Sequence, residues 1–549
     1  MTDTQPNVLM VAAECRDLAK VGGLGDVVRD LSKALRAGGT PARIIMPCYT
    51  RISHAPHPIS RFKVSFGQRD DWPVRIFLRE LDRVPIYLVE SPDFFGGPYG
   101  EIYIDSDRLG RGPFEDDAQR FAFFSAAVVA FLARHPELGI NVLHCHDWHT
   151  APALVLLKYD PRYQELAHNL RTLFTIHNLD YQGVRPFELA GVTEFAAFGQ
   201  WFPELYATLK DRDALTLIRD EHSPIPCFNP MRASINLADN VNTVSPCYAV
   251  EITQPDDPAR NFIGGRGLEQ DLQRLGDRLH GILNGLDYDL YAPNRLTPPF
   301  DVDTIDWTTA RHAHKAALLD NLVHDLTTLA HKSGAAFKNA DRVLDKLATF
   351  DAADWKGRML VVAVTRAVRQ KMSILLEPLD ERPASPEGTT LQQDTVIDAL
   401  LTRQIALILL GTGELEKELE AINAAPNGLF VAAFDPALAN RLYAAGDLFL
   451  MPSDFEPCGI SQMIAMREGC LPLVPDLGGL SNTVRDRETG FVYSGDSRPA
   501  ACQALLDTLD RAVQTFTEDQ SHWTAMQEQA MRMRFDWTTA AEQYIELYK

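Results

Sequence analysis

Two basic side chains in the second half of the chain could together bind a strongly anionic group, and a carboxylate lies on a nearby predicted loop. Arg366 and Lys371 follow the apolar run 360–364, and Glu456 follows the apolar run 448–451. Short apolar runs of this kind are typical of buried strands in a parallel sheet. Ligands bind at the carboxyl ends of such strands, where a guanidinium and an ammonium can stabilise a diphosphate. We therefore predict an anion-binding site with a carboxylate beside it.

Glycines punctuate the same region. Residues 460–468 have helical spacing, and Gly469 is a suitable stop for that helix because glycine adopts left-handed backbone at helix ends. Gly478 and Gly479 follow the next apolar run. A glycine lets the backbone approach a ligand closely, since it carries no Cβ. The two glycines therefore predict a second ligand contact beside Glu456.

A further glycine segment begins at Gly411, after the apolar run 405–410. It lacks the third glycine and the ribose-binding acid that complete a dinucleotide motif. A nicotinamide-dependent dehydrogenase is disfavoured for this reason.

The first half contains its own glycine-rich loop. The run Lys-Val-Gly-Gly-Leu-Gly-Asp occupies residues 20–26, after the apolar segment 8–13 and before the helical spacing of residues 27–35. Its glycines permit close backbone approach, and Lys20 supplies a mobile positive charge for a phosphate. The alternative is a strand-to-helix turn with a solvated lysine.

Histidines cluster after two predicted strands. His144-Cys145-His146-Asp147-Trp148-His149 follows one strand, and His177-Asn178 follows another. Such a cluster suggests zinc. We disfavour zinc because His144 and His146 are expected to point to opposite sides of their strand, and because no other Cys or His set has ligand spacing. A core role is expected for His144.

The elements that position these residues alternate between strand and helix, which predicts parallel βαβ units. Helical patterns such as 118–133 separate the strands, and residues 500–549 are mostly helical. Strands are predicted at residues 8–13, 43–46, 86–90, 142–144, 173–176, 241–244, 360–364, 405–410, 429–432, 448–451 and 471–474.

Length and composition predict two domains in a protein of the cytoplasm. A chain of 549 residues exceeds what one core usually supports, and the glycine- and proline-rich stretch 281–299 suits a crossing between domains. No apolar run could span a bilayer and no secretory signal is expected. The eight scattered cysteines suggest reduced thiols. A net charge of −21 argues against nucleic acids and anionic membranes as partners.

Together these motifs resemble the glycogen and starch synthases. The resemblance rests on Glu-Pro-Cys-Gly at 456–459 with Gly-Gly-Leu at 478–480, Lys-x-Gly-Gly-Leu-Gly-Asp at 20–26, His-x-His-Asp-Trp-His at 144–149, Thr-x-His-Asn at 175–178, and Arg366 with Gln370 and Lys371. It implies the α/β fold called GT-B, in which two Rossmann-like domains face each other across a cleft. The implied domains are residues 1–285 and 286–530, with the helix 531–549 returning to the first.

The resemblance also implies an activity. Members of the family transfer glucose from ADP-glucose to the non-reducing end of an α-1,4-glucan and retain the anomeric configuration, with no metal or cofactor. It implies catalytic roles for Asp147, His177, Arg366, Lys371 and Glu456. It implies donor binding by Lys20, Gly22, Gly23, Asn284, Gly411, Phe434, Cys458, Gly459, Gly478 and Gly479, and places Asp26 and Asn178 on the acceptor or sugar side.

Departures from the family pattern keep other activities open. Met372 stands where the family usually has glycine, and residues 202–229, 320–355 and 382–395 resemble insertions. UDP-glucose is an alternative donor, and a short oligosaccharide is an alternative acceptor. A glucan-binding paralogue without activity is a further alternative, which the intact Lys20, Arg366, Lys371 and Glu456 disfavour. The sequence shows no pattern that indicates an oligomeric state.

Overall fold

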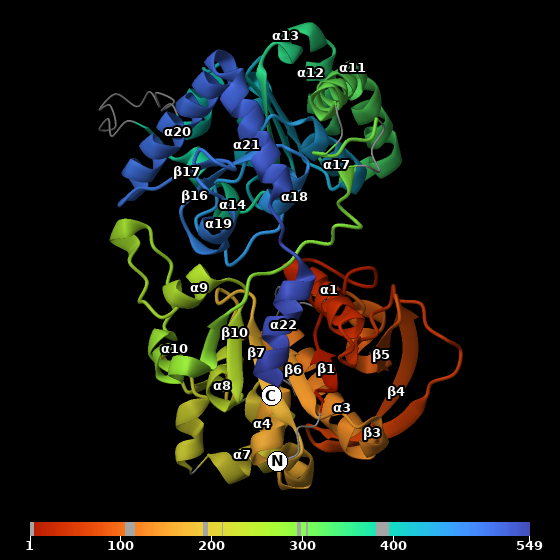
Figure 1. Ribbon diagram of the computed structural model, residues 1–549. Coiled ribbons are helices and arrows are strands. Elements are labelled where there is room, and N and C mark those ends of the chain that lie inside the picture. Colours follow the sequence, from red (N-terminus) through yellow and green to blue (C-terminus); the bar gives the residue numbers. More distant parts are fainter. Residues whose placement is uncertain are drawn as a thin grey trace. The chain divides into compact units, whose positions relative to one another are not determined.

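Two twisted sheets organise the computed structural model, one in each of two units (Figure 1). The structure describes residues 5–104, 116–189, 196–210, 212–293, 298–303, 306–379 and 395–549. The first unit comprises Met1–Asp256, Gly264–Gly285 and Asp536–Lys549. The second comprises Asp257–Ile263 and Leu286–Phe535.

The sheet of the first unit has nine strands among the described residues, in the order β11-β10-β7-β6-β1-β2-β5-β4-β3. From β11 to β5 all neighbours are parallel, whereas β4 is antiparallel to both β5 and β3. The strands are β1 (Val8–Val11), β2 (Ala42–Pro47), β3 (Ser60–Phe66), β4 (Arg69–Leu81), β5 (Val84–Glu90), β6 (Val142–His146), β7 (Arg171–Ile176), β10 (Asn240–Thr243) and β11 (Leu279–Gly281).

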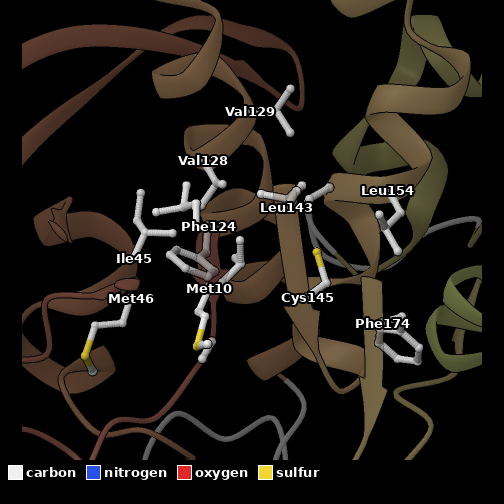
Figure 2. Close-up of a cluster of buried hydrophobic side chains, with 14 of the residues drawn as sticks. Met10, Ile45, Met46, Phe124, Val128, Val129, Leu143, Cys145, Leu154 and Phe174 are labelled. Carbon is white, nitrogen blue, oxygen red and sulfur yellow. The ribbon is translucent and has the colours of Figure 1, made fainter. Parts of the chain in front are cut away.

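Helices cover this sheet and close its core. The helix α3 (Asp117–Arg134) is buried over nearly its whole length, and Phe124 and Val128 from it belong to the same core cluster as Met10 of β1 and Ile45 of β2 (Figure 2). Central parallel strands are covered on both faces, so their sequences are almost continuously apolar. Further helices of this unit are α1 (Gly23–Ala37), α4 (Ala151–Tyr159), α8 (Pro230–Leu237), α9 (Pro246–Glu251) and α10 (Glu269–Leu275).

The last helix of the chain, α22 (Trp537–Tyr548), belongs to the first unit. The Tyr548 hydroxyl lies 2.9 Å from Nδ1 of His144, and the Asn242 side-chain amide donates to the Tyr544 hydroxyl at 3.0 Å. Both tyrosine hydroxyls are therefore satisfied inside the core. A Cβ on Gly285 would lie 2.6 Å from the ring of Trp537, so the chain crossing requires a glycine there.

The sheet of the second unit is parallel throughout, in the order β14-β13-β12-β15-β16-β17. Its strands are β12 (Met359–Val364), β13 (Ile405–Leu410), β14 (Gly428–Val431), β15 (Leu448–Leu450), β16 (Leu471–Pro475) and β17 (Phe491–Tyr493). Its helices include α11 (Trp307–Ser333), α12 (Ala340–Leu347), α13 (Ala352–Lys356), α14 (Arg369–Met372), α17 (Pro436–Ala445), α18 (Ser461–Arg467), α19 (Gly478–Thr483), α20 (Arg498–Glu518) and α21 (Gln520–Arg532).

All eleven predicted strands are confirmed to within a few residues, and the predicted α/β class is confirmed with them. The strands that the sequence did not predict are β3, β4, β11, β17 and the short pair β8 (Arg185–Pro186) and β9 (Cys227–Phe228). β3 is an edge strand with one face in solvent, and β4 contains Pro73, so neither forms a continuous apolar run.

The apparent insertion at 320–355 consists mainly of α11, α12 and α13. Most of the one at 382–395 lies outside the described residues. No helix in the described part of the chain is both long and apolar enough to cross a bilayer.

Replacing Gly411 by alanine tests the packing at the end of β13. A Cβ there would lie 1.7 Å from the carbonyl oxygen of Thr365, in the turn after β12. We expect Gly411→Ala to lower the free energy of unfolding by about 1–3 kcal/mol or more, because backbone must move. Calorimetry measures this. Gly357→Ala, whose Cβ would make an ordinary 3.5 Å contact, is the matched control in the same unit. Equal melting temperatures for the two variants would contradict the packing argument.

Candidate active site

A buried ion pair lies where two central strands of the sheet in the second unit end. We call the edge of a sheet at which its parallel strands end the carboxyl edge. Lys371, in the helix after β12, donates to Oε2 of Glu456, in the loop after β15. The side chains are only 13% and 8% exposed. The Ser453 hydroxyl donates to the same carboxylate oxygen at 3.3 Å. The structure thus brings together two predicted residues that are 85 positions apart in sequence.

Hydrogen bonds on both sides of this pair hold its two elements together. The side-chain amide of Gln370 donates to the Phe455 carbonyl at 3.1 Å, and the backbone N–H of Asp454 donates to the Gln370 carbonyl at 2.8 Å. The Asp454 carboxylate also accepts from Ser373 and Arg498. Lys371 and Glu456 are therefore presented by a stiff framework, with Asp454 and Arg498 as supports that the sequence alone did not identify.

Two other predicted residues of this edge are open to solvent. Arg366, after β12, is exposed, and its guanidinium has no ion pair with a described residue. Phe434, after β14, is 84% exposed, which is unusual for so large an apolar side chain. Both side chains are available to an anionic, aromatic ligand.

The glycines beside Glu456 serve the packing of the chain itself. The Gly479 N–H donates to the Glu456 carbonyl at 3.0 Å, and a Cβ on Gly479 would lie 2.3 Å from the backbone of Cys458. Gly459 and Gly478 have positive φ values of 75° and 47°. The neighbouring loop thus fills the space where a side chain on Gly479 would stand. Periodicity along the chain does not reveal which segment comes nearest.

In the first unit, Lys20 is paired within its own glycine-rich loop. Its ammonium lies 2.5 Å from Oδ2 of Asp26, and Arg16 lies 3.5 Å from the other oxygen of that carboxylate. Asp26 is 7% exposed, whereas the Lys20 side chain is 37% exposed. A Cβ on Gly22 would meet nothing within 4 Å. The loop therefore keeps open space at Gly22, as a ligand contact requires.

Glu14 is a residue that the sequence analysis missed. One of its oxygens accepts from the N–H groups of Val21 and Gly22 at 2.6 and 2.9 Å, and the other accepts from the Tyr103 hydroxyl at 2.9 Å. The Glu14 carboxylate thus holds the backbone of the glycine-rich loop in place through these hydrogen bonds. The sequence offers one signal for this role, because Glu14 directly follows the apolar segment 8–13.

Asp147 occupies a strained turn directly after β6. Its φ is 54°, which is unfavourable for a residue with a Cβ. Its Oδ1 accepts from the N–H of His177 at 2.7 Å, which links the ends of β6 and β7. Burial raises the pKa of Asp147 to about 8, although hydrogen bonds from the backbone of His177 and Asn178 oppose the shift. At neutral pH the carboxyl group of the free protein is thus largely protonated.

The histidines near Asp147 are neutral. Burial lowers the pKa values of His149 and His177 to about 3, and holds those of His144 and His146 well below the ordinary value. His146 Nδ1 and His177 Nε2 share a hydrogen bond of 3.0 Å.

The expectation that His144 and His146 point to opposite sides of β6 is wrong. Their ring centroids are 4.1 Å apart, because alternate residues of a strand share a face. The two nitrogens of His144 are taken by Tyr548 and Thr175, which is the core role expected for it. Among the described residues, no group of three or more His, Cys, Asp or Glu side chains could hold a metal ion.

Asn178 and Asn284 follow the ends of β7 and β11. The Asn178 side-chain oxygen accepts from the N–H of Asp180 at 3.0 Å. Asn284 is 5% exposed, and its buried Oδ1 has no hydrogen-bond partner within the described part of the protein. A buried amide oxygen without a partner is costly, which suggests a ligand as its partner.

The predicted residues thus form two groups, each at the carboxyl edge of one sheet. The edge in the first unit offers neutral hydrogen-bonding groups and the partly exposed ammonium of Lys20, which is paired with Asp26. The edge in the second unit offers an exposed guanidinium, an exposed aromatic ring and a buried ion pair. The first edge suits a polyhydroxyl group, and the second suits a diphosphate.

Comparisons with known proteins agree with this interpretation. The family described as "Starch synthase catalytic domain" matches residues 7–274, and "Glycosyl transferases group 1" matches residues 388–511. The chain is 33% identical to a glycogen synthase of Streptococcus sanguinis (strain SK36) and 34% identical to one of Streptococcus gordonii (strain Challis), over 99% of each chain.

A solved structure gives the same result. The catalytic domain of starch synthase IV from Arabidopsis thaliana, bound to ADP and acarbose, matches with a TM-score of 0.75 and 27% identity over 99% of both chains. The fold and the site therefore define a glycosyltransferase with two Rossmann-like domains. The chain belongs to the glycogen and starch synthase family.

The raised pKa of Asp147 predicts how stability depends on pH. The unfolded carboxyl group ionises near pH 3.9, whereas the folded one holds its proton to about pH 8. Wild type therefore loses stability as the pH rises between these values, by up to about 1.4 kcal/mol per pH unit. Asp147→Asn removes this loss. The free energy of unfolding of the variant, relative to that of wild type, should therefore increase from pH 5 to pH 7. Urea unfolding at both pH values measures this, and a constant difference would contradict the shift.

Replacing Glu14 tests its role in shaping the loop. Glu14→Ala leaves the N–H groups of Val21 and Gly22 without their acceptor, so we expect glycosyltransferase activity to fall by about tenfold or more. Glu14→Gln retains one oxygen for those N–H groups and should keep most of the activity. Steady-state kinetics of both variants check this. Equal losses of activity in both variants would show that activity depends on the negative charge of Glu14 and not on its hydrogen bonds to the loop.

Proposed function

We propose that the protein transfers glucose from ADP-glucose to the 4-hydroxyl at the non-reducing end of an α-1,4-glucan, with retention of the anomeric configuration. The observation that carries this proposal is the buried pair of Lys371 and Glu456, together with the exposed Arg366, which forms no ion pair with a described residue. Relatives with the name glycogen synthase, and a starch synthase bound to ADP and acarbose, support the donor and acceptor.

The basic groups of the second unit stabilise the leaving group in this proposal. Negative charge grows on the diphosphate as the glycosidic bond breaks, and fixed cations at a strand end stabilise it without reorganisation. Arg366 is exposed, and in this proposal it binds a phosphate directly. Lys371 already donates to Glu456, so the diphosphate adds a second anion to an ammonium whose position is set. No metal ion is part of this proposal.

Glu456, Phe434 and the glycine segments complete the donor site. Glu456 accepts hydrogen bonds from glucose hydroxyls and stabilises positive charge at the anomeric carbon. The exposed ring of Phe434 stacks on adenine. Gly411, Cys458, Gly459, Gly478 and Gly479 contribute backbone groups around the nucleotide and sugar.

The first unit supplies Lys20, Gly22, Gly23 and Asn284 to the donor, and Asp26, Asp147, His177 and Asn178 to the sugar side. With a pKa of about 3, His177 is neutral at physiological pH and acts through hydrogen bonds, not as a general acid. The proton of the acceptor hydroxyl therefore passes to the departing phosphate, on the same face of the sugar from which ADP leaves. This geometry retains the configuration.

A cytoplasmic location is part of the proposal. The eight cysteines, all of them described, are thiols and not disulfides, which suits a reducing compartment.

Kinetics with ADP-glucose and glycogen test the proposal. We expect Lys371→Ala and Glu456→Gln to lower kcat by about 10²–10³-fold, because each removes charge at the reacting centre. Lys338→Ala removes an exposed lysine of the same unit and is the control. Activity should persist in EDTA. Wild type that forms no longer glucan, or variants that equal it, would contradict the mechanism.

Initial rates with two donors test the nucleotide. ADP-glucose should be preferred over UDP-glucose, and Phe434→Ala should raise the KM for ADP-glucose with little change in kcat, because stacking is a binding contact. Preference for UDP-glucose would overturn the adenine assignment and leave the mechanism of transfer intact.

A further inference from the structure

A recess in the first unit has a polar lining that the proposed catalytic residues do not use. Its volume is about 370 Å³, within the range of small-molecule sites. We call it the Glu269 pocket. Its side chains come from three separate segments of the chain: Gln182, Asp220, His222, Asp256, Arg266 and Glu269.

The pocket is close to the proposed sugar-side residues. Gln182 is four residues after Asn178, and four residues span at most about 14 Å. Asp180, which lies between them, forms an ion pair of 2.8 Å with Arg266. A chain of sugars bound beside Asn178 could therefore reach the pocket within a few units.

The walls of the pocket are held in a defined shape. Arg266 and Gly267 have positive φ values of 52° and 84°. Asp256 holds this turn by accepting from the N–H of Gly264 at 2.8 Å and from Arg266 at 3.1 Å. A Cβ on Gly267 would lie 2.4 Å from the ring of His222, so the two segments pack without a gap. A site of this kind is preorganised.

Gln182 links its own segment of the pocket wall to the segments that contain Arg266 and Asp220. Its amide donates to the Arg266 carbonyl at 3.0 Å, and its oxygen accepts from Asn229 at 2.7 Å. Asn229 in turn donates to Asp220 at 2.8 Å.

The charges of the pocket select the class of ligand. Arg266 is neutralised by Asp180 and Asp256 together. Asp220 and Glu269 add further carboxylates, so a phosphate or nucleotide would be repelled. Oε2 of Glu269 is buried and has no hydrogen-bond partner among the residues that the structure describes. A carboxylate oxygen in this state accepts a hydrogen bond from a ligand hydroxyl.

Tyr181 is an exposed aromatic residue adjacent in sequence to the pocket residue Gln182. Its side chain is 58% exposed. An aromatic face with a polar hydroxyl offers both stacking area and a hydrogen bond. Carboxylates, an amide and an exposed tyrosine together suit a neutral polyhydroxyl ring.

We infer that the Glu269 pocket binds a glucose unit of the α-1,4-glucan acceptor, a few units before the end that is extended. The inference rests on the proposed function for the identity of the glucan, and it adds a specificity site for acceptors longer than a disaccharide. Long acceptors gain this contact and short ones do not.

Acceptors of two lengths test the inference in the full-length protein. Glu269→Gln should raise the KM for maltohexaose by about fivefold, because a hydroxyl bonds more weakly to an amide than to a carboxylate. Its kcat, its KM for ADP-glucose and its KM for maltose should change by less than about twofold. Tyr181→Ala, an exposed substitution, should give the same pattern. Glu165→Gln removes an exposed carboxylate of the same unit and is the control.

Calorimetric titration with maltohexaose, without donor, separates this inference from the proposed function. Wild type should bind, and Glu269→Gln should bind about fivefold more weakly. If wild type binds maltohexaose and transfers no glucose, the proposed function fails and the pocket is still tested by the variant. Equal affinities, or equal KM values for maltohexaose, would overturn the inference.

Discussion

An ammonium and a carboxylate that water barely reaches meet at the carboxyl edge of the second sheet. Removing one partner of such a pair typically costs about 3–5 kcal/mol, since the other charge stays buried alone. The contact between Lys371 and Glu456 therefore requires α14 and the loop after β15 to stay together, and Gln370, Asp454 and Arg498 reinforce that junction. In the proposed function, this junction offers a fixed cation to the diphosphate and a fixed carboxylate to the sugar.

The carboxyl edge of the first sheet differs from that of the second in the charge of its buried groups. Asp147 is buried and accepts from the backbone of His177 and Asn178, and its neutral form is favoured because burial raises its pKa. Burial lowers the pKa values of His144, His146, His149 and His177, so these side chains are neutral as well. Glu456 is buried with an ammonium. The edge in the second unit thus offers basic groups and the edge in the first unit offers neutral hydrogen-bonding groups, although the net charge of the chain is −21.

The glycines of the sequence motifs occupy different physical environments. Gly411 and Gly479 are required because backbone of the same unit lies against them, whereas Gly22 borders open space. Among these three, only Gly22 has open space where a Cβ would stand. The Glu269 pocket shows the converse case, since Gly267 closes a polar site that no glycine-rich motif indicated.

The sequence by itself determined the features that depend on neighbours along the chain. Periodicity located β13 at its observed bounds, and Gly469, with φ of 71°, ends α18 as helix stereochemistry requires. Tertiary structure decided which distant residues meet: Lys371 with Glu456, Glu14 with the amides of Val21 and Gly22, and His144 with Tyr548. It also decided the pKa of Asp147. Burial and charge pairing depend on the packing of remote segments, and a local pattern contains no information about which segments those are.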